Sequence, residues 1–437
     1  MSRSVDVVCL YEKALRELDV LCAIKALAER RGMSVEIVQQ DYGYGEAMQL
    51  RPRIVVLPYC YQERSNNFYL MRWREAAFVN FSWEQFFYPG NRIAKTPRGD
   101  FALNHVLHLS WSEGYSQLLR GAGIPEGHIV LTGNPALQLY REPYRRCFAD
   151  RGTLAQRYGL DPRRKWVFFP ENYNWAFYEQ PMLDQMMRDG QSPQDVAQMR
   201  DYATASFETA MAWCARLVRD ADIELVLRPR PATPLATMRE RVRAVIGALP
   251  ERFHILQDET VREWNLAADL VASSYSTSLV EAAIAGRRIM MLEPQPLPPA
   301  LVQEWHHLAP RAVRYEDLVA CLAGHEPNGA PLAQWASVTV SGPADPIAAV
   351  ADLLQAMRDG AAVLPPPASR ESVTIDRPAA VPFGLWWLLR LGKSALSQWK
   401  ARSPWRRAVP PESVPDVDAA ATIGARVARW KACLPGS

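Results

Sequence analysis

The chain has 437 residues, of which 49% are hydrophobic, and a formal net charge of +3 at pH 7. This length predicts two to three domains, and the hydrophobic content is enough to bury sizeable cores, which excludes a disordered protein. The small net charge does not favour nucleic acid binding, and no zinc-finger, RNA-binding or helix-turn-helix signature is present.

The spacing of the cysteines and the length of the apolar runs indicate the cellular compartment of the protein. The seven cysteines are scattered and form no C-x-x-C pair, so neither a zinc site nor a disulfide framework is supported, and a reducing compartment fits best. The start of the chain has no signal-peptide core, and no apolar run reaches the roughly eighteen residues of a spanning helix. We therefore expect a cytoplasmic protein.

Short apolar runs alternate with helix-length segments from the start of the chain. Residues 5–10 predict a strand, residues 15–30 have helical spacing and end at Gly32, and residues 35–38 return to strand character. This alternation is typical of parallel βαβ units. Further strands are predicted at 54–57, 78–81, 105–110 and 129–131, with a helix at 113–120. The first α/β domain is predicted at residues 1–150.

A polar, basic connection at residues 140–164 leads to a second series of the same kind. Strands are predicted at 166–169, 225–227, 253–256, 270–272 and 289–292, and a long helical region at 195–219. The second doubly wound domain is predicted at residues 151–345. Two such Rossmann-like domains facing a cleft make the GT-B architecture of nucleotide-sugar glycosyltransferases. Residues 346–437 are predicted to form a crossover helix, a Pro-rich linker and a basic amphipathic tail.

A hydroxyl-rich turn between a strand and a helix is the main candidate for a phosphate site. Residues 273–278 read Ser-Ser-Tyr-Ser-Thr-Ser, after the apolar run 267–272 and before a helical segment. Backbone N–H groups and hydroxyls converge there at the positive end of the helix dipole. The alternative is an ordinary helix cap, since Ser and Thr are preferred at that position.

Two arginines end a predicted strand upstream of the serine turn. Arg228 and Arg230 alternate with prolines after the β-rich run 223–227, and ligands of open α/β sheets bind at the carboxyl ends of strands. We expect both guanidinium groups to hold an anionic donor in the same crevice as the serine turn. The alternative for each arginine is a solvated or structural ion pair.

The order of several short segments resembles a known group of proteins. The segments are residues 80–85, 109–113, 123–125 with 129–135, 170–177, 227–231 and 273–278. Together they resemble the bacterial surface carbohydrate biosynthesis proteins of capsule polysaccharide and O-antigen (lipopolysaccharide) clusters. Those proteins are similar to the GT-B transferases that move Kdo or sialic acid from CMP donors. The resemblance covers roughly residues 1–345.

The resemblance implies roles for particular residues. In the CMP-dependent families a His-Pro pair and a Ser-Ser/Thr motif hold the donor, so Ser273, Ser274, Ser276 and Thr277 are implied to bind it, together with Asn134. Arg230-Pro231 stands where the His-Pro pair is expected. Arginine still binds phosphate or carboxylate but cannot act as a titrating acid, so an anion site is kept while the donor's identity stays open.

Sugar transfer needs carboxylates near the reacting carbon and at the acceptor proton. Glu84 lies among aromatic residues at 81–87, and Glu171 follows a strand and Pro170, so both are predicted to be catalytic. The alternatives are a Glu84 that caps a helix or forms a buried ion pair, and a loop hydrogen bonder at Glu171. Glu281, in the helix after the serine turn, is implied to bond the ribose hydroxyls of the donor, as the equivalent glutamate does in many GT-B enzymes.

No metal site or cofactor is expected beyond the nucleotide-sugar substrate. The D-x-D strings at 220–222 and 416–418 lie in a helix-to-strand turn and in the Pro-rich tail, and both are interpreted as incidental. A GT-B site uses helix dipoles and basic residues in place of a divalent ion.

The tail alternates basic residues with tryptophans and has no acidic residue from 378 to 411. On a helix, Arg390, Lys393, Ser397 and Lys400 share one stripe, and leucines with Trp399 cover much of the remainder. This pattern is typical of membrane-surface binding, here predicted for residues 381–407. The alternative is a helix packed on the protein's own domain.

The sequence therefore predicts a GT-B glycosyltransferase that is peripheral at the inner face of the cytoplasmic membrane. It is expected to transfer a sugar, Kdo or a related acidic sugar, from a CMP-linked donor to a lipid-linked surface glycan. The alternatives are a nucleotide-sugar epimerase, a CDP-alditol phosphotransferase and a non-catalytic scaffold of a polysaccharide assembly complex.

Overall fold

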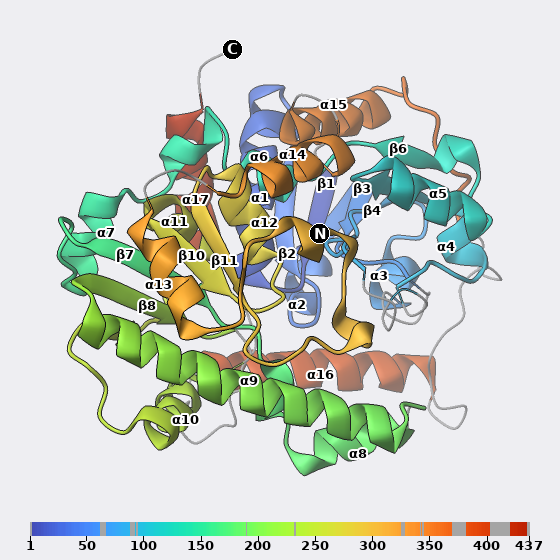
Figure 1. Cartoon of the computed structure of the whole chain (residues 1–437). Coiled ribbons are helices and arrows are strands. Elements are labelled where there is room, and N and C mark those ends of the chain that lie inside the picture. Colours follow the sequence, from blue (N-terminus) through green and yellow to red (C-terminus); the bar gives the residue numbers. More distant parts are fainter. Residues whose placement is uncertain are drawn as a thin grey trace. The chain divides into compact units, whose positions relative to one another are not determined.

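A computed structural model of the chain describes residues 2–61, 67–87, 92, 95–188, 190–230, 233–324, 328–340, 342, 345–368, 382–402 and 420–434 (Figure 1). The chain forms two compact units. Unit 1 contains Met1–Gln85, Asn91–Leu139 and Val338–Ser437, and unit 2 contains Phe86–Gly90 and Tyr140–Ser337. Each unit is built on its own sheet of six strands, so the predicted α/β fold with two Rossmann-like domains of the GT-B type is confirmed.

The sheet of unit 1 has the strand order β2-β1-β3-β4-β5-β6, and its strands are parallel. The strands are β1 (Arg3–Tyr11), β2 (Val35–Gln39), β3 (Leu50–Leu57), β4 (Ala77–Asn80), β5 (Val106–Ser110) and β6 (Ile129–Leu131). The helices are α1 (Ala14–Arg30), α2 (Tyr44–Ala47), α3 (Asn67–Arg72), α4 (Asp100–Asn104), α5 (Glu113–Gly121), α6 (Pro135–Gln138), α15 (Pro346–Arg358), α16 (Phe383–Arg402) and α17 (Ala420–Cys433), with a 3-10 turn at Glu126–His128.

Consecutive residues of the central strands are buried, as in a sheet that is covered on both faces. Val7, Val8 and Cys9 of β1 are fully inaccessible, which explains why this strand reads as a continuous apolar run. Helix α1 covers the sheet and is itself covered by α15 and α17. The carboxylate of Asp19 on α1 is buried and accepts a hydrogen bond from Arg429 of α17 at 2.8 Å.

Helix α17 was not predicted from the sequence, which indicated only a Pro-rich linker and a tail in this part of the chain. The helix ends near a second contact with α1, where Arg30 donates to the carbonyl oxygen of Leu434 at 3.0 Å. The end of the described chain is therefore part of unit 1, and removing it would uncover the buried Asp19 carboxylate.

The sheet of unit 2 has the order β12-β11-β10-β7-β8-β9, again with parallel strands. The strands are β7 (Lys165–Pro170), β8 (Ile223–Arg228), β9 (Phe253–Ile255), β10 (Leu270–Ser273), β11 (Arg288–Leu292) and β12 (Arg311–Ala312). The helices are α7 (Arg151–Tyr158), α8 (Gln180–Arg188), α9 (Pro193–Asp220), α10 (Leu235–Ile246), α11 (Val261–Ala267), α12 (Ser278–Ile284), α13 (Tyr315–Ala323) and α14 (Ala330–Thr339), the last of which ends in unit 1. Four 3-10 turns lie at Tyr144–Cys147, Asn174–Phe177, Pro299–Leu301 and Glu304–Leu308.

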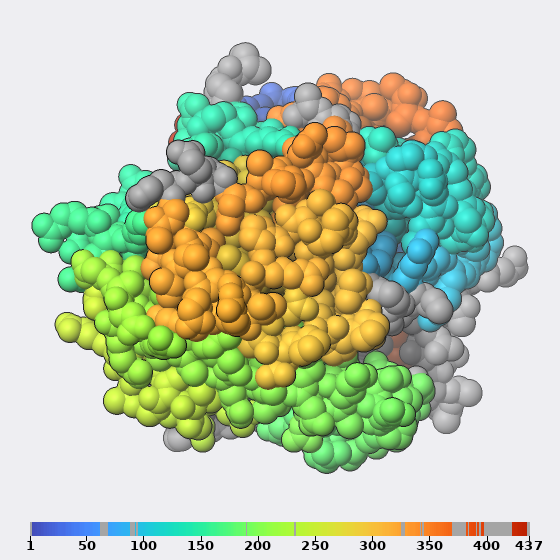
Figure 2. All heavy atoms as spheres, viewed as in Figure 1, coloured from blue at the N-terminus to red at the C-terminus, as the bar shows by residue number. Residues whose placement is uncertain are grey.

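The 28-residue helix α9 covers one side of unit 2, and its green side chains lie with those of α8 and α10 along the lower surface in Figure 2. The helix begins at a Ser192 cap, whose hydroxyl accepts the N–H of Asp195 at 3.0 Å. Its inward residues, among them Phe207 and Met211, pack in one hydrophobic core with β7 and β8. The long helix predicted at 195–219 is thus confirmed.

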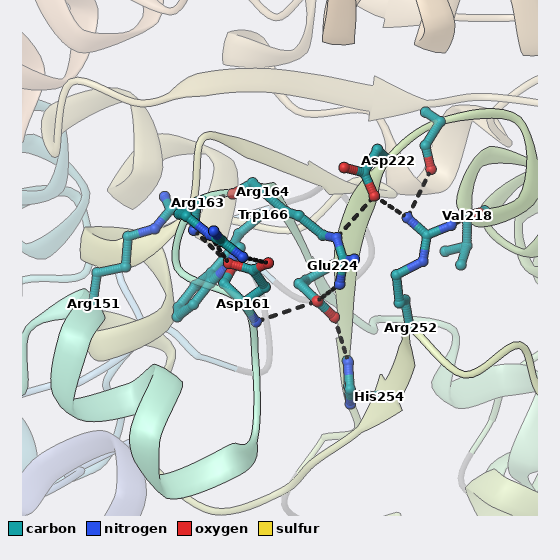
Figure 3. Close-up of polar contacts among 11 residues, drawn as sticks. Arg151, Asp161, Arg163, Arg164, Trp166, Val218, Asp222, Glu224, Arg252 and His254 are labelled. Atoms are coloured by element: carbon teal, nitrogen blue, oxygen red, sulfur yellow. Dashed lines mark hydrogen bonds and ion pairs between the residues drawn. The ribbon is translucent and has the colours of Figure 1, made fainter.

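An ion-pair network joins the amino ends of β7, β8 and β9 (Figure 3). The buried carboxylate of Glu224 accepts from Arg164 at 3.0 Å and contacts Nε2 of His254 at 2.7 Å. Asp222 accepts from Arg164 at 2.8 Å and from Arg252 at 2.6 Å. One member of the D-x-D string at 220–222 therefore holds strand ends together, at the edge of the sheet opposite to the candidate site.

Candidate functional site

The sheet of unit 2 has a topological switch point between β7 and β10, where successive strands change from one side of β7 to the other. Strands β8 and β9 follow on one side of β7, whereas β10, β11 and β12 lie on the other. Ligands of doubly wound folds bind outside the carboxyl ends of the strands at such a switch point. The predicted catalytic residue Glu171 follows β7 at this edge, and the predicted donor residues Arg228 and Ser273 end β8 and β10.

The serine turn connects β10 to α12, as predicted, and its hydroxyls have different environments. Ser273 is buried and donates to the carbonyl oxygen of Pro170 at 2.5 Å, which ties β10 to β7. Ser276 accepts the N–H of Ser278 at 3.2 Å. Ser274 is completely buried, and its hydroxyl has no hydrogen bond within the described residues. Thr277 occupies the cap position of α12 without a capping bond from its side chain.

Glu171 is a buried carboxylate at the end of the central strand. Only 4% of the residue is exposed. One carboxylate oxygen accepts the N–H of Tyr173, and the other accepts the N–H of Arg230 at 3.5 Å. Burial raises the pKa of Glu171, although the Tyr173 amide and the charge of Arg230 act in the opposite direction. A carboxyl group whose ionised form is disfavoured in this way suits proton transfer.

The two predicted arginines have different environments. Arg228 is buried, its Nε donates to the carbonyl oxygen of Glu259 at 3.1 Å, and burial lowers its pKa to about 10. This contact supports the loop before α11. Arg230 is half-buried, and its guanidinium forms no hydrogen bond or ion pair within the ranges that the structure describes. Its neighbour Pro231 lies outside those ranges.

Two further donor residues are engaged in contacts of their own. Glu281 lies on the first turn of α12, where one carboxylate oxygen accepts the hydroxyl of Tyr140 at 2.5 Å. Asn134 belongs to unit 1 and caps α6, since its side-chain oxygen accepts the N–H of Ala136 at 2.9 Å. The contact of Asn134 with a donor stays a prediction.

Glu84 lies beyond β4, near the switch point between β1 and β3 in unit 1. Ser82 has a φ of 50°, a left-handed value that is unusual for a serine. The side chains of Asn80 and Tyr115 bond Ser82 at 3.2 Å and 3.0 Å and so hold this turn. The chain then reaches Glu84, two residues after this turn.

Glu84 is ion-paired, as in its alternative interpretation, but the pair is not buried. Its carboxylate accepts from Arg16 of α1 at 2.8 Å and from the ammonium group of Lys95. Arg16 is also bonded to the buried Glu17 at 2.6 Å and lies over the ring of Tyr59, 5.6 Å from its centre. About a third of the Glu84 side chain remains exposed, at 38%. The two cations hold the Glu84 carboxylate in place.

Sequence reasoning missed the partners of Glu84. Arg16 follows the carboxyl end of β1 by five residues, so the position of a strand end was the available signal for it. Lys95 carries no such signal, because only the tertiary fold brings it to Glu84. In the part of the chain that the structure describes, no group of three or more His, Cys, Asp or Glu side chains could hold a metal ion.

Comparisons with known proteins define the fold. No protein-family model and no curated protein matches the sequence. Solved structures do match, including the wall teichoic acid polymerase TagF (H444N variant) at 11% identity and a TM-score of 0.52, over 82% of this chain and 89% of that chain. A co-structure of Staphylococcus aureus MnaA with UDP matches at 11% identity and a TM-score of 0.51, over 82% and 97% of the two chains. A candidate UDP-N-acetylglucosamine 2-epimerase from Listeria monocytogenes matches at 13% identity and 0.50, over 82% and 97%. At these identities the chain shares the GT-B-like fold of these proteins.

Proposed function

We propose that this protein is a glycosyltransferase that moves a sugar from a nucleotide donor to a surface glycan acceptor. The observation that carries the proposal is the set of residues at the switch point of unit 2. Glu171, Arg230 and the serine turn follow three neighbouring strands, and the Arg230 guanidinium and the buried Ser274 hydroxyl have no hydrogen-bond partner in the described structure. A cation at the same edge of the sheet as a hydroxyl-rich turn suits a phosphate, and the buried carboxylate suits proton transfer.

The donor is proposed to be CMP-linked and to carry Kdo or a related acidic sugar, with no metal ion as cofactor. The order of the short segments and the serine motif support this choice. Arg230 supports it further, because an acidic sugar brings a carboxylate that an arginine binds well. The UDP in the MnaA co-structure makes UDP the competing nucleotide.

A screen of nucleotides by thermal shift tests the donor. CMP or a CMP-sugar is expected to raise the melting temperature of the full chain more than CDP, UDP or GDP at equal concentration. A ligand at 100 times its Kd stabilises the native state by about 2.7 kcal/mol. Inorganic phosphate at the same concentration controls for a simple anion effect. A larger, saturable shift with UDP would assign the donor to UDP.

A nucleotide-sugar epimerase is the second candidate, and the fold shared with a candidate UDP-N-acetylglucosamine 2-epimerase favours it. The two functions differ in what they do to a sugar nucleotide without an acceptor. An epimerase inverts a ring carbon and keeps the nucleotide attached, whereas a transferase gives at most slow hydrolysis. NMR of UDP-N-acetylglucosamine incubated with the protein distinguishes these outcomes, and a second sugar nucleotide at equilibrium would establish the epimerase.

We propose that α16 holds the protein at the inner face of the cytoplasmic membrane, beside a lipid-linked acceptor. No helix in the described ranges is long and apolar enough to cross a membrane. The helix has two kinds of apolar residues. Trp386 is buried, and Trp387 and Leu391 pack against the core of unit 1. Four leucines on the helix are exposed: Leu385, Leu388, Leu389 and Leu396.

The exposed leucines support the membrane proposal, while the packed tryptophans agree with the alternative of packing on the protein. Helix α16 can therefore pack on unit 1 through its tryptophans and still present its exposed leucines to a membrane. Positions 385, 388, 389 and 396 lie on one side of a helix. The side chains of Arg390, Lys393, Ser397 and Lys400, which were predicted as a polar stripe, and residues 403–407 lie outside the described residues.

Sedimentation with vesicles tests this proposal. The full chain is expected to pellet with phosphatidylcholine vesicles that contain phosphatidylglycerol, and less at high salt. Leu388→Asp with Leu389→Asp is expected to lower the bound fraction about tenfold or more, since each leucine contributes roughly 1.5–3 kcal/mol when buried. Val338→Asp, at a still more exposed position of α14, is the control. Equal recovery of all three proteins would show that α16 only packs on unit 1. Point changes are preferred to truncation because α17 follows α16 and packs on α1.

A further inference from the structure

The loop between β9 and α11, residues 256–260, is bonded to the carboxyl end of β8. The N–H of Leu256 donates to the carbonyl oxygen of Leu227 at 3.0 Å and so continues the pairing of the two strands. The carbonyl oxygen of Glu259 accepts from Nε of Arg228 at 3.1 Å. The first residue of this β9–α11 loop and a residue near its end are thus both bonded to β8.

Gln257, in the same loop, bonds the chain beyond β8. Its Nε2 donates to the carbonyl oxygen of Arg230 at 3.0 Å and to the carbonyl oxygen of Thr233 at 2.9 Å. A carbonyl oxygen can only accept a hydrogen bond, so both contacts require the amide nitrogen of Gln257 and thereby set the orientation of its side chain. The two protons of one amide group therefore join two backbone carbonyl groups.

The backbone of Arg230 is bonded to two further residues. Its carbonyl oxygen accepts the N–H of Thr233 at 2.9 Å, and its own N–H donates to Oε2 of Glu171 at 3.5 Å. The N–H of Glu171 donates in turn to the carbonyl oxygen of Arg228 at 3.0 Å. The main chain of Arg230 is therefore fixed, whereas its guanidinium has no partner within the ranges that the structure describes.

The β9–α11 loop has supports of its own at Glu259. The φ of Glu259 is 62°, a left-handed value that is uncommon for a residue other than glycine. Its carboxylate accepts the hydroxyl of Tyr158 at 3.1 Å and pairs with Arg157, and both partners lie on α7. Backbone in such a sparsely populated region persists only where the surrounding contacts determine it. The loop that carries Gln257 is thus anchored to a helix as well as to β8.

A fixed main chain has a consequence for an arginine that binds an anion. Ordering a long side chain on binding lowers the affinity, and a site that is already oriented avoids part of this cost. The backbone of Arg230 sets the direction in which its side chain leaves the chain. Holding that backbone therefore limits the positions that the guanidinium can reach.

We propose that Gln257 is a positioning residue, which holds the main chain of Arg230 so that the guanidinium is oriented for the anionic group of the nucleotide donor. This inference rests on the proposed nucleotide-binding function. It gives a role to the loop after β9, which contains none of the residues predicted to bind the donor.

A double-mutant cycle tests the proposal, with calorimetric titration of the full chain by CMP and by UDP. Gln257→Leu removes both donor protons and keeps a side chain of similar size. It is expected to weaken nucleotide binding about five- to tenfold, within the range of coupling between residues in contact. Because this effect acts through Arg230, the double variant of Gln257→Leu with Arg230→Ala is expected to bind no more weakly than Arg230→Ala alone.

Hydrogen exchange tests the support of the backbone without any nucleotide. The readout is the exchange rate of the peptide that contains Arg230 and Thr233. Gln257→Leu is expected to make this peptide exchange about two- to tenfold faster, which is the effect of one lost hydrogen bond on local opening. Arg230→Ala is expected to leave the rate unchanged, since the contacts of Gln257 and Thr233 are with the backbone.

Asn328→Leu is the matched control, because the amide of Asn328 also bonds the backbone of unit 2. It accepts the N–H of Ile289 at 2.8 Å and donates to the carbonyl oxygen of Ile289 at 3.0 Å. The control should keep the wild-type affinity for nucleotide and the wild-type exchange rate of the Arg230 peptide.

The two measurements separate a wrong positioning role from a wrong function. If Gln257→Leu leaves affinity and exchange unchanged, or weakens binding equally with and without Arg230→Ala, Gln257 does not position Arg230. If Gln257→Leu speeds the exchange but the wild type binds neither CMP nor UDP, the proposed nucleotide site is wrong, and the positioning role with it.

Discussion

Replacing Arg230 by alanine is expected to lower the affinity for the nucleotide donor about 10- to 100-fold. The guanidinium of Arg230 is half-buried at the carboxyl edge of the sheet and has no partner in the described structure. A hydrogen bond to a charged group contributes about 1.5–3 kcal/mol, and each 1.4 kcal/mol is a factor of ten in Kd. The measurement is calorimetric titration with the nucleotide that gives the largest thermal shift.

Two other arginines make this experiment specific. Arg219→Ala, at an exposed position of α9, controls for the loss of one positive charge and should bind like the wild type. Arg228→Ala should instead lower the melting temperature, because it removes the buried contact with the Glu259 carbonyl. A folded Arg230→Ala protein with unchanged affinity would exclude Arg230 from the donor site.

The fold could be predicted because both sheets are parallel and covered on both faces. Each strand then appears as a short apolar run, such as Val7, Val8 and Cys9, and each intervening helix has its own spacing. The serine turn was predictable for the same reason, since a buried strand ends there and a helix begins. Helix α7 was missed because polar and basic residues dominate its segment, and helix α17 was missed because its short segment follows a Pro-rich stretch and is stabilised by packing on α1.

The sequence placed residues at the carboxyl edge but did not determine what each side chain contacts. Arg228 and Arg230 are two positions apart, yet one supports a loop and the other is available, because β8 ends at Arg228 and the chain then turns. Glu84 was recognised as a candidate, whereas its ion pairs with Arg16 and Lys95 depend on segments far apart in the chain. Tyr140 was read as part of a polar connection, although it is buried beside Glu281.

Glutamine at position 84 is expected to reduce the rate of sugar transfer by 10²- to 10⁴-fold while nucleotide binding and folding are retained. Glutamine keeps the shape of the side chain but cannot accept a proton, and general acid–base catalysis contributes an effect of this size. Glu171→Gln tests the second predicted carboxylate in the same way. Its buried carboxylate contacts only the N–H groups of Tyr173 and Arg230 in the described structure, and a glutamine oxygen can still accept one of them.

The assay follows hydrolysis or transfer of the sugar nucleotide that stabilises the protein, with kcat and KM measured separately. Glu113→Gln, an exposed residue of α5 paired with Arg120, is the control and should keep the wild-type rate. A fall in kcat with KM unchanged assigns a role in the chemical step, whereas a rise in KM alone would assign Glu84 to binding. Because Glu84 faces two cations, Glu84→Gln also leaves Arg16 and Lys95 with one anionic partner fewer, so its melting temperature must be measured beside its rate. If both glutamine variants turn over the donor at the wild-type rate, the proton acceptor of the reaction is neither Glu84 nor Glu171.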